Sequence, residues 1–213
     1  MQCETCREDV LPVVLVDIDG TIANYHDHLT TFATDYWDIE SPDYRWNGDG
    51  NFEDYLGLTQ GQYREAKLAF RQGGMKRTMP AFEMGDWFVH TLNELPLEVW
   101  FTTTRPWQRL DNVDPDTRFW LDHNGFQYHR LLFDDNKYER VCQIIDPERI
   151  LLVVDDLPEQ YDICTELELP VFQVARHHNS GVKQRREWRG TLLQAQTLVN
   201  VNMKEWYEKH GRT

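Results

Sequence analysis

Short apolar runs recur along the chain and alternate with longer segments in which apolar residues return every three or four positions. Such runs are typical of strands buried on both faces of a sheet, and the longer segments are typical of amphipathic helices. The predicted strands are Val13–Val16, Leu97–Thr103, Arg130–Phe133, Ile150–Val154 and Val171–Val174. The predicted helices cover about 116–124, 138–145, 160–166 and 191–207. This alternation predicts an α/β fold with a Rossmann-like, mostly parallel sheet, flanking helices and right-handed crossovers.

Residues 22–95 do not follow this alternation, because they are rich in aromatic and polar residues. Within them Thr59 and Gln62 have the spacing of a capping box, which predicts the start of a helix that Gly73 ends. A second helix is predicted to begin at Pro80. We therefore expect a small, mainly helical insertion after the first strand. The expected division is a core of residues 1–21 and 96–213 with an insertion of residues 22–95.

Polar residues that can do chemistry follow the ends of the predicted strands. Asp17 and Asp19 come directly after the first strand, Thr103 ends the second, and Asp155 follows the fourth. Lys137 stands shortly after the third strand. Because the carboxyl ends of parallel strands share one edge of a sheet, we expect these side chains to lie together, where ligands bind in open α/β folds.

These residue types suit the hydrolysis of a phosphate monoester. A carboxylate nucleophile, Asp17, can divide the displacement into two steps, and Asp19 can serve as the acid and base. Thr103 and Lys137 can stabilise charge on the phosphoryl oxygens. Magnesium prefers oxygen ligands, which Asp17 and Asp155 would supply, with Asp156 nearby. Singly, each residue also has an ordinary structural interpretation, as a turn cap, a helix N-cap or a solvated side chain.

The order Asp17-Ile18-Asp19-Gly20-Thr21, Thr103, Lys137 and Asp155-Asp156 resembles the four motifs of the haloacid dehalogenase superfamily. The resemblance implies a helical cap at the insertion, a Mg²⁺ cofactor, and the main-chain carbonyl of Asp19 as a further metal ligand. Within that superfamily, the acid at the position of Asp19 resembles the first motif of phosphatases and phosphomutases rather than that of dehalogenases. No P-loop motif occurs, which argues against an attached P-loop kinase.

The later motifs resemble the phosphatase domain of phage polynucleotide kinase-phosphatases. That resemblance implies substrate contacts for Arg105 and Asp134 and a nucleic-acid 3′-phosphate as substrate. The core also resembles the deoxyribonucleotidases, so a 5′-nucleotidase acting on free nucleoside monophosphates is the alternative. A phosphotransferase and a non-catalytic binding module are further alternatives.

The insertion offers aromatic side chains that could stack a base, or could simply pack the cap: Phe32, Tyr36, Trp37, Trp46, Phe52, Tyr55 and Phe70. It also offers basic side chains that could bind substrate or form a wet face: Arg64, Lys67, Arg71, Lys76 and Arg77.

The formal net charge of −14 and the sequence pI of about 4.9 argue against broad attraction to nucleic acid or to anionic membranes. We therefore expect no stable nucleic-acid complex, and a small nucleotide suits the charge better than a polymer. No apolar run has the length of a membrane span and no signal peptide is evident, so a cytoplasmic location is expected.

Cys3 and Cys6 form a lone C-x-x-C pair. His177 and His178 could complete it as a zinc site, although reduced thiols near the terminus are favoured.

Overall fold

A computed structural model describes residues 10–106, 108–181 and 188–211. The apolar runs form a six-stranded sheet in the order β3-β2-β1-β4-β5-β6, in which every adjacent pair is parallel. The strands are β1 (Val13–Asp17), β2 (Glu98–Thr103), β3 (Arg130–Phe133), β4 (Ile150–Asp155), β5 (Val171–Val174) and β6 (Arg189–Gly190). The predicted α/β fold with a parallel sheet and flanking helices is confirmed.

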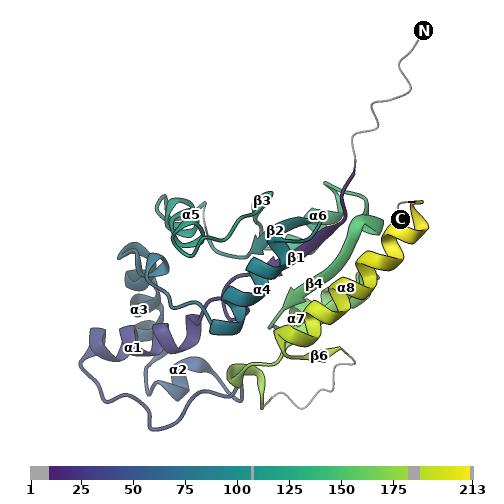
Figure 1. Ribbon diagram of the computed structural model, residues 1–213. Coiled ribbons are helices and arrows are strands. Elements are labelled where there is room, and N and C mark those ends of the chain that lie inside the picture. The colour runs from purple at the N-terminus through teal and green to yellow at the C-terminus, as the bar shows by residue number, and fades with distance from the viewer. Residues whose placement is uncertain (1–9, 107, 182–187, 212–213) are drawn as a thin grey trace.

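Helices cover both faces of the sheet, which explains why its strands are apolar without alternation. Val14 and Val16 point to the side that carries α4 (Glu83–Asn93), α5 (Val113–His123) and α8 (Leu192–Lys209). Val13 and Leu15 point to the side that carries α6 (Lys137–Cys142) and α7 (Pro158–Glu166). Figure 1 shows α4 and α8 lying together along the sheet. Among the described residues, no helix combines the length and the apolar character that a membrane crossing needs.

The insertion gathers beyond the carboxyl ends of the strands (Figure 1). It contains α1 (Tyr25–Trp37), α2 (Phe52–Tyr55), α3 (Gln60–Gln72) and the short 3₁₀ helix η1 (Met75–Arg77). The predicted capping box is present, since Thr59 Oγ1 accepts from the amide of Gln62 and the Gln62 side chain accepts from the amide of Thr59. Helix α4 packs on α8 and β2 rather than with α1 and α3. The domain boundaries at 22 and 95 stay a prediction.

Two helix starts differ by three residues from those predicted. The helix expected from Pro80 begins at Glu83, because the preceding residues form a bridge with the chain after β1. There Asn24 donates its amide to the carbonyl of Pro80, and Phe82 donates its amide to Ile22. Helix α5 begins at Val113 instead of 116. A proline stands in its first turn, where backbone N–H groups have no intrahelical partner, so the N–H that proline lacks costs the helix no hydrogen bond. The other 3₁₀ helices are η2 (Pro147–Arg149) and η3 (His177–Asn179).

Candidate active site

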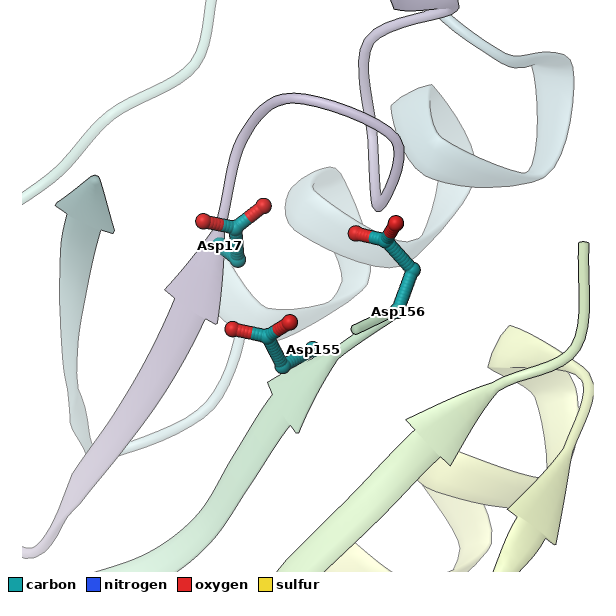
Figure 2. A group of neighbouring side chains, drawn as sticks. All are labelled: Asp17, Asp155 and Asp156. Atoms are coloured by element: carbon teal, nitrogen blue, oxygen red, sulfur yellow. The ribbon is translucent and has the colours of Figure 1, made fainter. Parts of the chain in front are cut away.

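The strand order reverses beside β1, which pairs with β2 on one side and with β4 on the other. In an open parallel sheet such a reversal leaves a crevice at the carboxyl ends of the two strands, where ligands bind. Asp17 is the last residue of β1, Asp155 is the last residue of β4, and Asp156 follows it (Figure 2). The fold therefore brings Asp17 together with Asp155 and Asp156, which are far from it in the sequence, at the sheet edge where ligands bind.

The three carboxylates are buried and close together. One oxygen from each of Asp17, Asp155 and Asp156 lies within 4.8 Å of the others. Burial raises the pKa of Asp17 well above its usual value, and the charges of Asp155 and Asp156 raise it further, although Lys137 opposes this. Burial also raises the pKa of Asp156, but a hydrogen bond from His178 outweighs it and the net shift is downward. Burial and the neighbouring acids therefore disfavour the charged form of Asp17, whereas His178 and Thr21 favour the charged form of Asp156.

Lys137 is the cation inside this cluster. Its Nζ lies 2.5 Å from Asp17 Oδ1 and 2.7 Å from Asp155 Oδ2. Burial lowers the pKa of Lys137, but the charges of Asp155 and Asp17 outweigh burial and raise it above its usual value. Tyr138, the next residue on α6, donates its hydroxyl to Asp155 Oδ2 at 2.5 Å. Lys137 is therefore charged and fixes Asp17 relative to β4.

Asp19 points away from the other acids, into a pair of cations. Arg105 Nη2 lies 2.6 Å from Asp19 Oδ1, and Arg105 Nε lies 2.9 Å from Oδ2, a two-pronged contact. Lys76 Nζ, from η1 of the insertion, lies 2.5 Å from Asp19 Oδ2. Burial raises the pKa of Asp19, but Arg105 and Lys76 outweigh it and hold that pKa far below its usual value. Asp19 is therefore ionised in this arrangement.

A cavity of about 200 Å³ lies beside Asp17 and Asp19, and Thr103 lines it. Arg105 also lines it, although two of its nitrogens are engaged with Asp19 and a third donates to Thr117 at 2.7 Å. Asp134 lies outside this cavity, in an adjoining one of about 460 Å³ that shares Arg105. Its Oδ1 accepts the amide of Asn136, which precedes α6. The structure thus groups Asp17, Asp19, Thr103, Lys137, Asp155, Asp156 and Arg105, and leaves Asp134 at the outer cavity.

Several residues that the sequence did not assign complete the site. Thr21 donates its hydroxyl to Asp156 Oδ1 at 2.7 Å, and His178 Nε2 lies 2.6 Å from Asp156 Oδ2. The position of Thr21 in the first motif was a usable signal, whereas nothing in the local sequence of His178 connects it to a site 22 residues earlier. His178 therefore contacts Asp156, while Cys3 and Cys6 lie outside the described residues.

The aromatic side chains of the insertion are mostly not at the acids. Phe70 is fully buried in the core. Trp46, Phe52 and Tyr55 line a separate cavity of about 470 Å³. His26 borders both that cavity and the one beside Asp17. Asp, Lys and Arg make up half of the residues that line the space next to Asp17, and Tyr25 of the insertion lines it as well.

The acid cluster fits a divalent cation. Carboxylate oxygens are the hard ligands that Mg²⁺ and Ca²⁺ prefer, and Asp17, Asp155 and Asp156 each offer one within reach of the others. Burial and the charges of Asp155 and Asp156 raise the pKa of Asp17, and a bound cation would favour the charged form of this carboxylate. The Asp19 side chain is not part of this cluster. The metal ligand expected from Asp19 is therefore its main-chain carbonyl, as the motif resemblance implies.

Comparison with solved structures places this architecture among known folds. A predicted phosphatase from Clostridium acetobutylicum superposes with a TM-score of 0.60 at 12% identity, covering 92% of this chain and 99% of that one. A haloacid dehalogenase-like hydrolase from Streptococcus pneumoniae superposes with a TM-score of 0.55 at 12% identity, covering 88% and 97%. The chain has the haloacid dehalogenase-like fold.

The fold alone does not determine which reaction the chain catalyses. An L-2-haloacid dehalogenase also superposes, with a TM-score of 0.57 at 12% identity over 90% of this chain and 100% of that one. No protein-family model matches the sequence, and no curated protein does so either. The activity of this haloacid dehalogenase-like chain must therefore be argued from its site.

Proposed function

We propose that the protein is a Mg²⁺-dependent phosphomonoesterase that works through an aspartyl-phosphate on Asp17. The observation that carries the proposal is the contact of Asp17 with Lys137, next to Asp155 and Asp156, at the strand-order reversal. A nucleophilic carboxylate needs a fixed position and nearby positive charge to approach an anionic ester. The second acid, Asp19, favours hydrolysis of a phosphate over dehalogenation, as its motif resemblance implies.

In the first step, a carboxylate oxygen of Asp17 bonds to phosphorus while the bond to the leaving oxygen breaks. Asp19 donates a proton to that oxygen. In the second step, water attacks phosphorus, Asp19 takes the proton of the water, and the bond to Asp17 breaks. Inorganic phosphate leaves and both acids return to their starting state. Thr103 donates a hydrogen bond to a phosphoryl oxygen, and Lys137 neutralises charge beside it.

The ion pairs of Asp19 place a condition on these steps. An ionised Asp19 cannot donate a proton, and Arg105 and Lys76 hold it ionised. Phosphate oxygens can accept the same N–H groups. We infer that substrate binding draws Arg105 and Lys76 from Asp19 toward the phosphate, which raises the pKa of Asp19, so that it takes up a proton from solvent and can act as the acid.

Asp17, Asp155 and Asp156 would hold Mg²⁺, together with the main-chain carbonyl of Asp19. When bound, the cation would neutralise charge on the phosphate and on the acids.

For the substrate, we propose a nucleotide or a nucleic-acid terminal phosphate, as in a polynucleotide 3′-phosphatase. The motif resemblance supports this through Arg105 and Asp134, which line one outer cavity. The alternative, a 5′-nucleotidase on free nucleoside monophosphates, is favoured by the aromatic cavity of Trp46, Phe52 and Tyr55 on the other side of His26. A phosphotransferase would require an acceptor, and a binding module would not require the full acid set.

Phosphate release tests the proposal. The purified chain is assayed with Mg²⁺ against nucleoside 3′- and 5′-monophosphates, 3′-phosphorylated oligonucleotides and sugar phosphates. We expect release from at least one class, and a loss of at least about 1000-fold in Asp17→Asn. Adding a sugar or nucleoside acceptor should not divert the phosphate. Equal release by the wild type and Asp17→Asn would overturn the mechanism.

A further inference from the structure

Positive charge in the cavity beside Asp17 exceeds what its acids neutralise. Lys67, Arg71, Lys76 and Arg105 all line this cavity. Lys76 and Arg105 are paired with Asp19. Within the described part of the chain, neither Lys67 nor Arg71 forms an ion pair. In a protein with a net charge of −14, two unpaired cations at the candidate active site need an explanation.

The insertion holds these two residues in place. They stand four positions apart on α3, so they lie on one side of the helix. Ala66 and Phe70, the neighbours that precede them, are fully buried and anchor the helix to the core. At the end of α3, the carbonyl of Arg71 accepts a hydrogen bond from Asn112 Nδ2 at 2.6 Å, next to the start of α5. Lys67 and Arg71 are thus fixed at the cavity wall rather than spread over a free surface.

Both side chains have lost part of their contact with water. Among the described residues, Arg71 Nε is buried and has no hydrogen-bond partner. Burial lowers the pKa of Lys67 and the charge of Arg71 lowers it further, although the charges of Asp19 and Glu53 partly oppose this. The Tyr63 ring, 5.2 Å from Lys67 Nζ, is a weak partner for a cation. A partly desolvated pair of like charges that forms no ion pair is costly unless an anion binds there.

The position of the pair relative to Asp17 indicates which anion this is. The scissile phosphate would lie at Asp17, where Lys137 and Thr103 from the core receive it. Arg71 lies on the other side, where the cavity meets the outer one, since Arg71, Thr104, Arg105 and Pro106 line both. A leaving group that extends toward that junction passes α3. A second charge on the substrate would therefore meet Lys67 and Arg71.

We propose that Lys67 and Arg71 bind a second anionic group, a carboxylate or a phosphate, on the leaving-group side of the ester. This inference rests on the proposed phosphatase function and narrows its substrate class. It accommodates a nucleoside bisphosphate or a 3′-phosphorylated strand, whose neighbouring phosphodiester carries the second charge, as well as a small phosphorylated carboxylic acid. A substrate with a neutral leaving group would offer Lys67 and Arg71 no anionic partner.

Matched substrate pairs test the inference. Nucleoside 3′,5′-bisphosphate is compared with the nucleoside 3′-monophosphate, and 3-phosphoglycerate with glycerol 3-phosphate. In at least one pair, we expect the member that carries the second anionic group to have the higher kcat/KM. The first pair reports a second phosphate and the second reports a carboxylate, so the preferred pair identifies the group.

Variants then assign the preference to the two residues. In Lys67→Met and Arg71→Met, we expect the kcat/KM ratio within the preferred pair to fall about 10- to 100-fold. Arg71→Lys should restore part of the ratio. Arg64→Met, an exposed arginine on the same helix, is the control and should keep the wild-type ratio.

Two outcomes would contradict the inference while leaving the phosphatase proposal intact. Wild-type protein could hydrolyse monoesters without any preference for a second charge. Alternatively, the Lys67 and Arg71 variants could lose activity equally on both members of a pair, which would mean that they bind the scissile phosphate itself. Absence of hydrolysis of every ester, in wild type and Asp17→Asn alike, would instead overturn the phosphatase proposal.

Discussion

At the scale of single residues, Gly20 determines whether Asp156 can reach the site. Gly20 has φ of +96°, and a Cβ atom there would lie 2.4 Å from Asp156 Oδ2. Gly20→Ala therefore both strains the backbone and displaces a carboxylate of the acid cluster. We expect a loss of about 1–3 kcal/mol in the free energy of unfolding, measured by denaturant titration, and a large loss of phosphatase activity.

Gly50→Ala is the matched control for that prediction. Gly50 also has a positive φ, +71°, but a Cβ atom there would meet nothing within 4 Å. This variant should show the backbone cost alone and keep its activity. If both variants keep activity, contact between Gly20 and Asp156 does not control the site.

His26 makes the stability of the protein depend on pH. Burial and, to a smaller extent, the neighbouring His178 together lower the pKa of His26 to about 3, against the opposing charge of Asp156. Because the folded pKa lies below the unfolded value of about 6.5, only the unfolded chain gains this proton between these pH values, and stability falls as the pH falls. At about pH 5 this residue alone should cost about 2 kcal/mol relative to about pH 7.5.

His26→Gln removes that titration. Its free energy of unfolding should decrease less than that of the wild type over the same pH range, as measured by urea denaturation at each pH. Parallel decreases in the two proteins would mean that the pKa of His26 is not lowered in the folded state. Since other titrating groups are shared by both proteins, the difference between the two curves isolates His26.

Residues at strand ends were predictable from the sequence, and residues contributed by distant loops were not. Asp17 and Asp155 end apolar runs, and parallel topology alone brings such positions together. Lys76 was named only as one of several basic residues of the insertion. Nothing in the sequence distinguishes Lys76, which is buried on Asp19, from the adjacent Arg77, which lies exposed over the Phe119 ring. That difference depends on how the insertion packs on the core.

At the scale of elements, the capping box of α3 connects local sequence to the proposed substrate contacts. Thr59 Oγ1 accepts the amide of Gln62 at 3.3 Å at the start of the helix that carries Lys67 and Arg71. Thr59→Ala should destabilise the protein by about 1 kcal/mol, measured by thermal or chemical denaturation. Thr59→Ser keeps the hydroxyl and should stay close to wild type. Equal losses in both would show that the threonine methyl group, not the cap, stabilises this end.

Element boundaries were predicted well where local chemistry sets them and poorly where tertiary pairing does. The start of α3 follows from its capping box and was predicted correctly. The start of α4 was predicted at Pro80, but Ala81 pairs with Ala23 and keeps the chain extended until Glu83. That pairing depends on the course of the chain after β1, which the sequence around Pro80 does not contain.

At the scale of the whole molecule, a cation bound at the acid cluster would stabilise the folded chain. Asp17 ends β1, and Asp155–Asp156 stand at the end of β4, far along the sequence, so unfolding separates them. A cation held by all three would bind the folded chain and not the unfolded one. Mg²⁺ should therefore raise the melting temperature, by an amount corresponding to about 2.7 kcal/mol when its concentration is 100 times Kd. Chelation by EDTA should reverse the increase.

Asp156→Asn separates binding at the cluster from a general effect of salt. The substitution keeps the size of the side chain but removes one of the charges that attract the cation, so the Mg²⁺-induced increase should shrink strongly. Glu205→Gln removes a charge from an exposed position on α8, far along the sequence from the cluster, and should retain the full increase. Equal increases in the two variants would mean that Mg²⁺ acts through ionic strength, and the cluster would lose its proposed role as the metal site. A smaller increase confined to Asp156→Asn would tie the cation to the crevice between β1 and β4, the same crevice in which Asp17 is expected to attack phosphorus.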